Sequence, residues 1–252
     1  LWDDLTTRIA LMPLGAPDHT SWSVAAVKPT ALPADCAMDE TEDQIIITSA
    51  GQRITVDLTA LAFTFDQPGG AAGQAVRARL GRAGSQLAWQ SDLAPGERVF
   101  AGGQRTGPLD KRGRRLTLWA TDPMPDSDDA TGAMYQSIPI AVMLRGDQAH
   151  GIFFDGSHRA VIDAGQADPA ALLYLTDAPD LVAYVFGGPS LGDVLRRYTG
   201  VTGRMPPLPR WSLGAQQSRW GYDSAEEVRS IARTMREHDI PCDAIYLDID
   251  YM

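Results

Sequence analysis

Between residues 40 and 186 the chain is a succession of short apolar or alternating segments separated by turn residues, with no helical periodicity between them. The turns at residues 50–51 and 145–147 each join two such segments, which predicts two β-hairpins. The 24 glycines and 17 prolines of the 252-residue sequence are in keeping with many tight turns. Strands that follow one another without intervening helices form antiparallel sheets, so we predict an antiparallel β-sandwich.

After residue 187 the pattern changes. Ser190 is a helix N-cap for residues 191–198, and a proline-rich connector follows at residues 205–209. We draw a domain boundary there, which gives a β-sandwich domain with a terminal connecting helix at residues 1–205 and a second domain at residues 206–252.

The second domain has the pattern of a βαβ unit. Residues 211–216 and 242–249 are apolar segments of strand character. Between them, Ser224 and Glu227 form a capping-box signature ahead of apolar residues at helical spacing. The 44 residues from Pro209 to Met252 are far fewer than the ~250 of a (β/α)8 barrel. We therefore predict a mainly β protein that ends in the first βαβ unit of a truncated barrel, and a polypeptide that continues beyond this chain.

The net charge and the spacing of cysteines and histidines argue against several classes of partner. The formal net charge of −10 argues against nucleic-acid and anionic-membrane partners. The two cysteines lie too far apart in sequence for a metal-site spacing, and the four histidines show none either. We expect no metal and no cofactor. A cytoplasmic protein is the default expectation, a cleaved signal peptide remains an alternative, and homo-oligomer formation stays open.

Carboxylates follow the second predicted strand. Asp248 and Asp250 come directly after an apolar run, at the end of a strand where α/β folds assemble their active sites. Such a pair could hold sugar hydroxyls, could form the Asp-x-Asp metal site of a glycosyltransferase, or could cap a helix and remain solvated. Residues 216–222, QQSRWGY, lie at the same end of the first strand and add amide, guanidinium and indole groups of the kind that sugar sites use.

Several motifs resemble glycoside hydrolase family 31, and most closely its bacterial α-glucosidases. They are VFAGGQRTGPLDKRGRRLTLWATD (99–122), YQSIP (135–139), HGIFFD (150–155), PPLPRWSLGAQQSRWGY (206–222) and CDAIYLDIDYM (242–252). The resemblance runs from about residue 95 to the last residue and is looser before it. Two departures, Ala120 in place of the family's usual Asn and Gln217 in place of its usual Cys, bear on which glycoside is the substrate.

The resemblance implies a β-sandwich followed by a (β/α)8 barrel that hydrolyses terminal α-glucosidic bonds with retention. Retaining enzymes need a nucleophile and an acid/base ~5–5.5 Å apart, and the family carries both on later barrel strands. This segment alone is therefore expected to have no catalytic residue. By the same resemblance, Asp122, Trp220, Asp248 and Ile249 are expected to bind the α-glucoside or oligosaccharide, next to the rest of the barrel.

Three alternatives remain open on the sequence. Within the family, the activity could be that of an α-xylosidase or a sulfoquinovosidase. The chain could instead be a non-catalytic carbohydrate-binding fragment. A metal-dependent glycosyltransferase that uses Asp248 and Asp250 is the third, and chelator-insensitive hydrolysis of an α-glucoside would rule it out.

Overall fold

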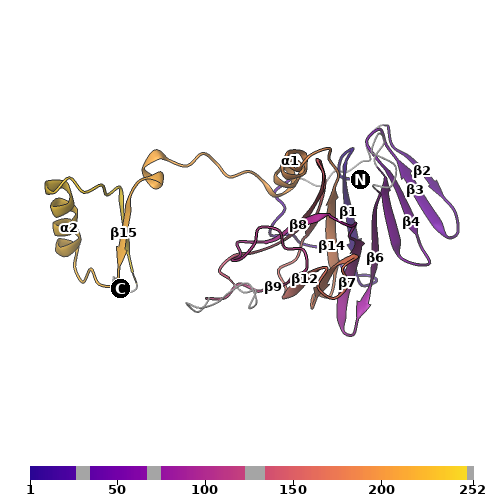
Figure 1. Cartoon of the computed structure of the whole chain (residues 1–252), viewed down its shortest axis with the longest axis horizontal. Helices are drawn as coiled ribbons and strands as arrows, with labels where there is room; N and C mark the ends of the chain where they lie inside the picture. Colours follow the sequence, from indigo (N-terminus) through magenta and orange to yellow (C-terminus); the bar gives the residue numbers. More distant parts are fainter. Residues whose placement is uncertain (27–34, 67–74, 123–133, 249–252) are drawn as a thin grey trace. The chain divides into compact units, whose positions relative to one another are not determined.

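The structure, a computed structural model, describes residues 1–26, 35–66, 75–122 and 134–248. The chain divides into two compact units, Leu1–Gly203 and Arg204–Met252 (Figure 1). The first unit consists of strands with one helix, and the second holds two strands and a helix.

Two antiparallel sheets form the first unit. One sheet has the strand order β1-β14-β11-β10-β8 and the other the order β2-β3-β4-β5-β6-β7-β13-β12-β9. The strands are β1 Thr6–Leu11, β2 Ala37–Glu40, β3 Gln44–Thr48, β4 Arg53–Asp57, β5 Ala62–Asp66, β6 Val76–Ala83, β7 Gln86–Asp92, β8 Arg98–Gly103, β9 Arg115–Leu118, β10 Ser137–Arg145, β11 Gln148–Phe154, β12 Ala160–Ala164, β13 Ala171–Thr176 and β14 Leu181–Phe186. Both predicted hairpins are present, as β3–β4 and β10–β11. The mainly β class with antiparallel sheets is confirmed.

The core of the sandwich lies between the two sheets. Trp89 of β7 is fully buried, and its indole meets the ring of Phe154 of β11 edge to face, with centroids 5.8 Å apart. The Trp89 Nε1 donates to Ser91 Oγ at 2.6 Å, so the polar end of the indole is also satisfied. Successive residues of a strand point to opposite faces, and Phe153 accordingly belongs to a second apolar cluster on the other side of its sheet.

Helix α1, Leu191–Thr202, covers that second cluster. Its N-cap is Ser190, whose side chain accepts from the backbone N–H of Asp193, as the sequence predicted. The helix continues four residues beyond the predicted end at Tyr198, because Val201 is buried against the sheet and favours a further turn. Strand β14 and most of β11, at the centre of the five-stranded sheet, are therefore buried on both faces.

Close packing of α1 depends on a glycine in β11. A Cβ on Gly151 would lie 2.6 Å from Cγ1 of Val194, which is fully buried. Gly151→Ala should therefore overpack this contact and lower the free energy of unfolding by about 1–3 kcal/mol, as a lower urea midpoint would show. Gly81→Ala in β6 is the matched control, because nothing lies within 4 Å of a Cβ there and alanine restricts the unfolded chain. Equal midpoints for the two variants would contradict this account.

The second unit contains β15 Gln216–Arg219, α2 Ala225–Glu237 and β16 Ala244–Leu247, and the two strands pair in parallel. The Ser224 side chain accepts from the Glu227 N–H at 3.2 Å, which bears out the helix start. This is the partial start of a barrel that the pattern predicted. No residue of α2 is buried, and the part of the chain that the structure describes leaves its apolar residues Val228, Ile231, Ala232 and Met235 only half-buried.

The prediction of a strand at residues 211–216 is wrong. Residues Arg210–Leu213 form a short 3-10 helix that follows Pro209, with the Ser212 N–H donating to the Pro209 carbonyl at 3.0 Å. The strand begins only at Gln216, where pairing with Ala244 starts. Apolar side chains alone did not make these residues a strand. In the described part of the chain, backbone pairing between the two segments starts with the Asp243 N–H, which donates to the Ala215 carbonyl at 2.7 Å, so residues 211–214 have no strand partner.

Candidate functional site

The parallel register of the second unit brings two of the predicted residues together. Its last pair is Arg219 with Leu247, and Trp220 and Asp248 directly follow these two residues. Both therefore lie at the carboxyl edge of the same two strands. The Trp220 side chain is 74% exposed, and Asp248 is exposed as well. Trp220 and Asp248 thus occupy neighbouring backbone positions at the edge where barrel enzymes bind substrates.

The turn after β15 explains why Trp220 is exposed. Gly221 has φ +112° and Tyr222 has φ +80°, two successive residues with positive φ. Tyr222 is consequently buried, and the Arg219 guanidinium lies over its ring, 5.5 Å from the centroid. Arg219 also forms an ion pair of 3.5 Å with Glu227 in the first turn of α2. These contacts hold the turn and leave the indole of Trp220 facing solvent.

Ile249, which the sequence assigned to the substrate site, and Asp250 lie outside the described residues.

Asp122 belongs to the first unit, at the end of a segment that leaves β9. The backbone N–H of Thr121 donates to the Met134 carbonyl at 3.1 Å, and the Tyr135 hydroxyl donates to Asp122 Oδ1 at 2.5 Å. Asp122 and Tyr135 are both exposed, as is Trp119 at 51%. The segment therefore presents a carboxylate and two aromatic rings to solvent, the groups that bind hydroxyls and the C–H face of a sugar.

Tyr135 is a candidate that the sequence did not identify. The hydrogen bond to Asp122, and then the negative charge of that carboxylate, raise the pKa of the Tyr135 phenol above its usual value near 10. At neutral pH the phenol is thus a stable donor that orients Asp122. Tyr135 begins the YQSIP motif, but pairing with a residue 13 positions earlier is not visible in a motif.

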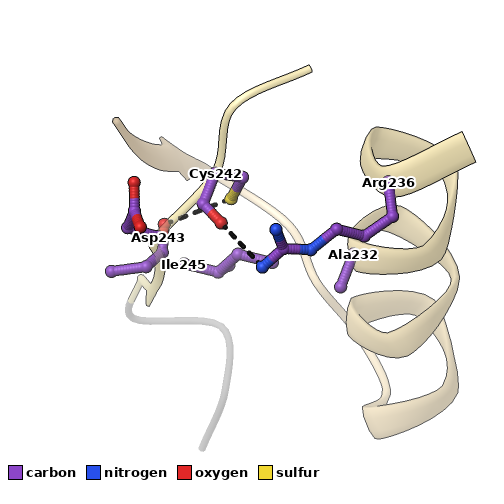
Figure 2. A pocket seen from close by; sticks show the side chains of 6 residues that line it. Ala232, Arg236, Cys242, Asp243 and Ile245 are labelled. Atoms are coloured by element: carbon purple, nitrogen blue, oxygen red, sulfur yellow. Dashed lines mark hydrogen bonds between the residues drawn. The ribbon is translucent and has the colours of Figure 1, made fainter. Parts of the chain in front are cut away.

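A cavity of about 260 Å³ lies at the opposite end of β16, between this strand and α2 (Figure 2). Arg236 reaches across it and donates from Nη2 to the Cys242 carbonyl at 3.3 Å, and the Cys242 thiol donates to the Ala244 carbonyl at 3.5 Å. The cavity is at the amino end of the strand, where barrels carry stabilising contacts rather than substrate sites. It therefore does not extend the site around Trp220 and Asp248.

None of the helices in the described ranges has the length and apolar character that crossing a membrane requires. No group of three or more His, Cys, Asp or Glu side chains in the same ranges is arranged to hold a metal ion.

Two family models match the chain in agreement with its two units. The glycosyl hydrolase 31 N-terminal galactose mutarotase-like domain matches residues 4–163, and the glycosyl hydrolases family 31 TIM-barrel domain matches residues 205–252. The first match alone covers more than half of the chain.

Individual relatives agree with these matches. The chain is 36% identical over 252 residues to alpha-glucosidase 2 of Bacillus thermoamyloliquefaciens, which covers 97% of this chain and 31% of the relative. It is 30% identical over 161 residues to the alpha-xylosidase XylQ of Lactiplantibacillus pentosus. This match covers 63% of this chain and 20% of the relative. The chain thus spans a third or less of the length of these relatives.

A solved structure shares the fold. The GH31 dextranase FjDex31A of Flavobacterium johnsoniae, complexed with glucose, superimposes with a TM-score of 0.85 at 21% identity, covering 100% of this chain and 31% of that one. Together with the family models, this likeness confirms the resemblance that the motifs indicated. The chain belongs to glycoside hydrolase family 31, and it carries that family's N-terminal domain together with part of its TIM-barrel domain.

Proposed function

We propose that the full-length protein is a retaining α-glucosidase that hydrolyses terminal α-linked glucose, and that this chain supplies groups that bind the non-reducing-end sugar. The observation that carries the proposal is the juxtaposition of Trp220 and Asp248 after paired parallel strands. An indole face beside a carboxylate suits a ring with one apolar face and several equatorial hydroxyls. The 36% identity to a protein named alpha-glucosidase 2 supports glucose as the sugar.

The roles of the groups follow from their chemistry. Asp248 accepts hydrogen bonds from sugar hydroxyls as a charged acceptor, and Trp220 packs against the sugar ring. Asp122 of the sandwich adds a second charged acceptor that Tyr135 orients. The nucleophile and the acid/base, which must lie ~5–5.5 Å apart for retention, are expected on later barrel strands. This chain then binds the sugar and leaves bond cleavage to those strands.

The proposal for Asp122 predicts a kinetic defect without a folding defect. In the full-length enzyme, Asp122→Ala should lower kcat/KM for p-nitrophenyl α-glucoside by about five- to tenfold, because one charge-assisted hydrogen bond to the sugar is lost. The melting temperature should change little, since an exposed loop carboxylate contributes little to folding. Asp147→Ala, at an exposed turn of the same domain, is the matched control. A large drop in melting temperature with unaltered kinetics would instead assign Asp122 a structural role.

α-Xylosidase activity is the second candidate, favoured by the 30% identity to a protein named alpha-xylosidase XylQ. Xylose lacks the hydroxymethyl group of glucose, so the two activities differ in whether the site accepts that group. Comparing kcat/KM for the p-nitrophenyl α-glucoside, α-xyloside and α-sulfoquinovoside separates these alternatives. Preference for the xyloside would overturn the glucosidase proposal, and preference for the sulfoquinovoside would do the same.

A further inference from the structure

We infer that Arg105 is a positioning residue for the sugar site, because its guanidinium joins the two strands from which Asp122 and Tyr135 extend. We use the term stem for residues 119–122 and 134–136, which lead from β9 and into β10. The inference deepens the function proposed for Asp122 and rests on it for its catalytic consequence.

The contacts of Arg105 lie at the base of the stem. Its Nη2 donates to the Thr117 carbonyl in β9 at 2.8 Å and to Ser137 Oγ at the start of β10 at 3.1 Å. Its Nε donates to the Gly102 carbonyl in β8 at 3.1 Å. One side chain therefore bonds to the strand that the stem leaves, the strand that it enters, and a third strand beside them.

The two strands that carry the stem belong to different sheets. β9 is an edge strand of the nine-stranded sheet, whereas β10 lies between β8 and β11 in the five-stranded sheet. No backbone ladder joins β9 to β10, and at Thr117 and Ser137 the two strands are bridged by the Arg105 side chain. A planar guanidinium can donate in several fixed directions at once, which a lysine ammonium on a flexible stem does not reproduce.

Two glycines at the end of β8 leave room for the Arg105 side chain and for the start of β10. Gly102 and Gly103 have φ +88° and +81°, a conformation that favours glycine. A Cβ on Gly102 would lie 3.2 Å from Arg105 Nε, and one on Gly103 would lie 2.9 Å from the Ile138 backbone nitrogen. The loop that continues from Arg105 is held in turn by Lys111, whose Nζ donates to the Thr106 carbonyl at 2.7 Å.

Beyond the contacts of Arg105, two hydrogen bonds join the two segments of the stem. Thr121 bonds to Met134 through the backbone, and the Tyr135 hydroxyl bonds to Asp122. Both bonds join the β9 side of the stem to its β10 side. A change in the spacing of Thr117 and Ser137 would therefore act on both bonds, the Tyr135–Asp122 pair included.

The first test follows the titration of the Tyr135 phenol in the absence of any sugar. A 3-fluorotyrosine at position 135 of the full-length protein, followed by 19F NMR, reports the phenol titration. Asp122→Ala in the same labelled protein gives the midpoint of the phenol without its partner. Arg105→Lys should move the titration midpoint down towards that value.

Arg112→Lys is the matched control and should leave the midpoint unchanged. Its guanidinium also bonds to three carbonyls, but those of Ala94, Glu97 and Pro169, which lie outside the stem and its strands.

The second test is a double-mutant cycle on kcat/KM for p-nitrophenyl α-glucoside. Arg105→Lys alone should lower kcat/KM about threefold to fivefold, whereas Arg112→Lys should leave it unchanged. In the Asp122→Ala background the effect of Arg105→Lys should disappear, because residues that act through one group are not additive.

The outcomes separate the two proposals. An unmoved 19F titration in Arg105→Lys, or an equal shift in Arg112→Lys, overturns the positioning role. An Arg105→Lys effect of full size in the Asp122→Ala background also overturns it, because Arg105 then acts by another route. A shifted titration with wild-type kinetics in both Arg105→Lys and Asp122→Ala supports the positioning of the Tyr135–Asp122 pair by Arg105, and it refutes the sugar-binding role of Asp122 and with it the catalytic consequence of Arg105.

Discussion

Asp248→Asn in the full-length enzyme is expected to lower kcat/KM for an α-glucoside at least ~10-fold. A carboxylate that accepts hydrogen bonds from sugar hydroxyls contributes roughly 1.5–3 kcal/mol in a site from which substrate excludes water. Asparagine keeps the shape, but it removes the charge and replaces one acceptor by a donor. Asp248 follows β16 at the carboxyl edge of the sheet, in the sugar site proposed above, where this loss would act on bound substrate.

A deoxy substrate distinguishes sugar binding from a structural role of Asp248. If the carboxylate contacts a particular hydroxyl, the penalty of Asp248→Asn should shrink on the glucoside that lacks that hydroxyl. Asp243→Asn is the matched control, because Asp243 precedes the same strand at its amino end. The same penalty on every deoxy glucoside and on the parent would show that Asp248 holds the strand in place and is not a sugar ligand.

The sandwich domain is expected to lose stability between about pH 6.5 and pH 4 because of His150. The ring is 16% exposed overall, but its Nε2 is buried with no hydrogen-bond partner among the described residues. Burial, and then the positive charge of Arg145, lower the pKa of His150 from 6.5 to about 4. The imidazole is therefore neutral in the folded protein at pH 5, whereas most unfolded chains carry a proton there.

The direction of the effect follows from proton counting. Between pH 6.5 and pH 4 the unfolded chain binds more protons at His150 than the folded chain, so lowering the pH favours unfolding. A pKa difference of this size corresponds to about 3 kcal/mol in the limit. Glu97, whose Oε1 lies 3.9 Å from His150 Nδ1, acts in the opposite sense. Burial raises its pKa against the lowering effects of the Ala94 N–H and of Arg145 and Arg112, so the folded state binds the extra proton there.

Urea unfolding at pH 7 and pH 4.5 measures this contribution. In His150→Gln the fall in unfolding free energy between the two pH values should be smaller than in the wild type by about 2 kcal/mol. His158→Gln is the control, because His158 is exposed in the folded domain and folding does not remove it from water. A wild-type pH dependence in His150→Gln would refute this account.

Local sequence was enough to predict much of the fold. The hairpins at residues 50–51 and 145–147 follow from turn residues between alternating segments, which depend on neighbours in the chain. The helix starts at Ser190 and Ser224 follow from hydroxyls that accept from N–H groups three residues later. The prediction at residues 211–216 failed because a strand also requires a partner, and its partner begins at Ala244.

The residues of the candidate site also fall into those that the sequence identified and those that only the structure revealed. Trp220, Asp248 and Asp122 could be named from the sequence, since each stands in a motif or directly follows an apolar run. Their roles remain predictions. Tyr135 and Arg105 were missed, because their contacts join segments that are separated in sequence and, for Arg105, joined across two sheets.

The sequence by itself determined the two hairpins, the starts of the two α-helices and the family that the chain resembles, since turn chemistry, caps and motifs act over a few residues. Only the tertiary structure decided which side chains meet. Packing one sheet on the other brings Thr117 and Ser137 to either side of one guanidinium, and parallel pairing of β15 with β16 brings Trp220 beside Asp248. Such contacts arise from the burial of apolar faces contributed by the whole domain, which no local pattern encodes.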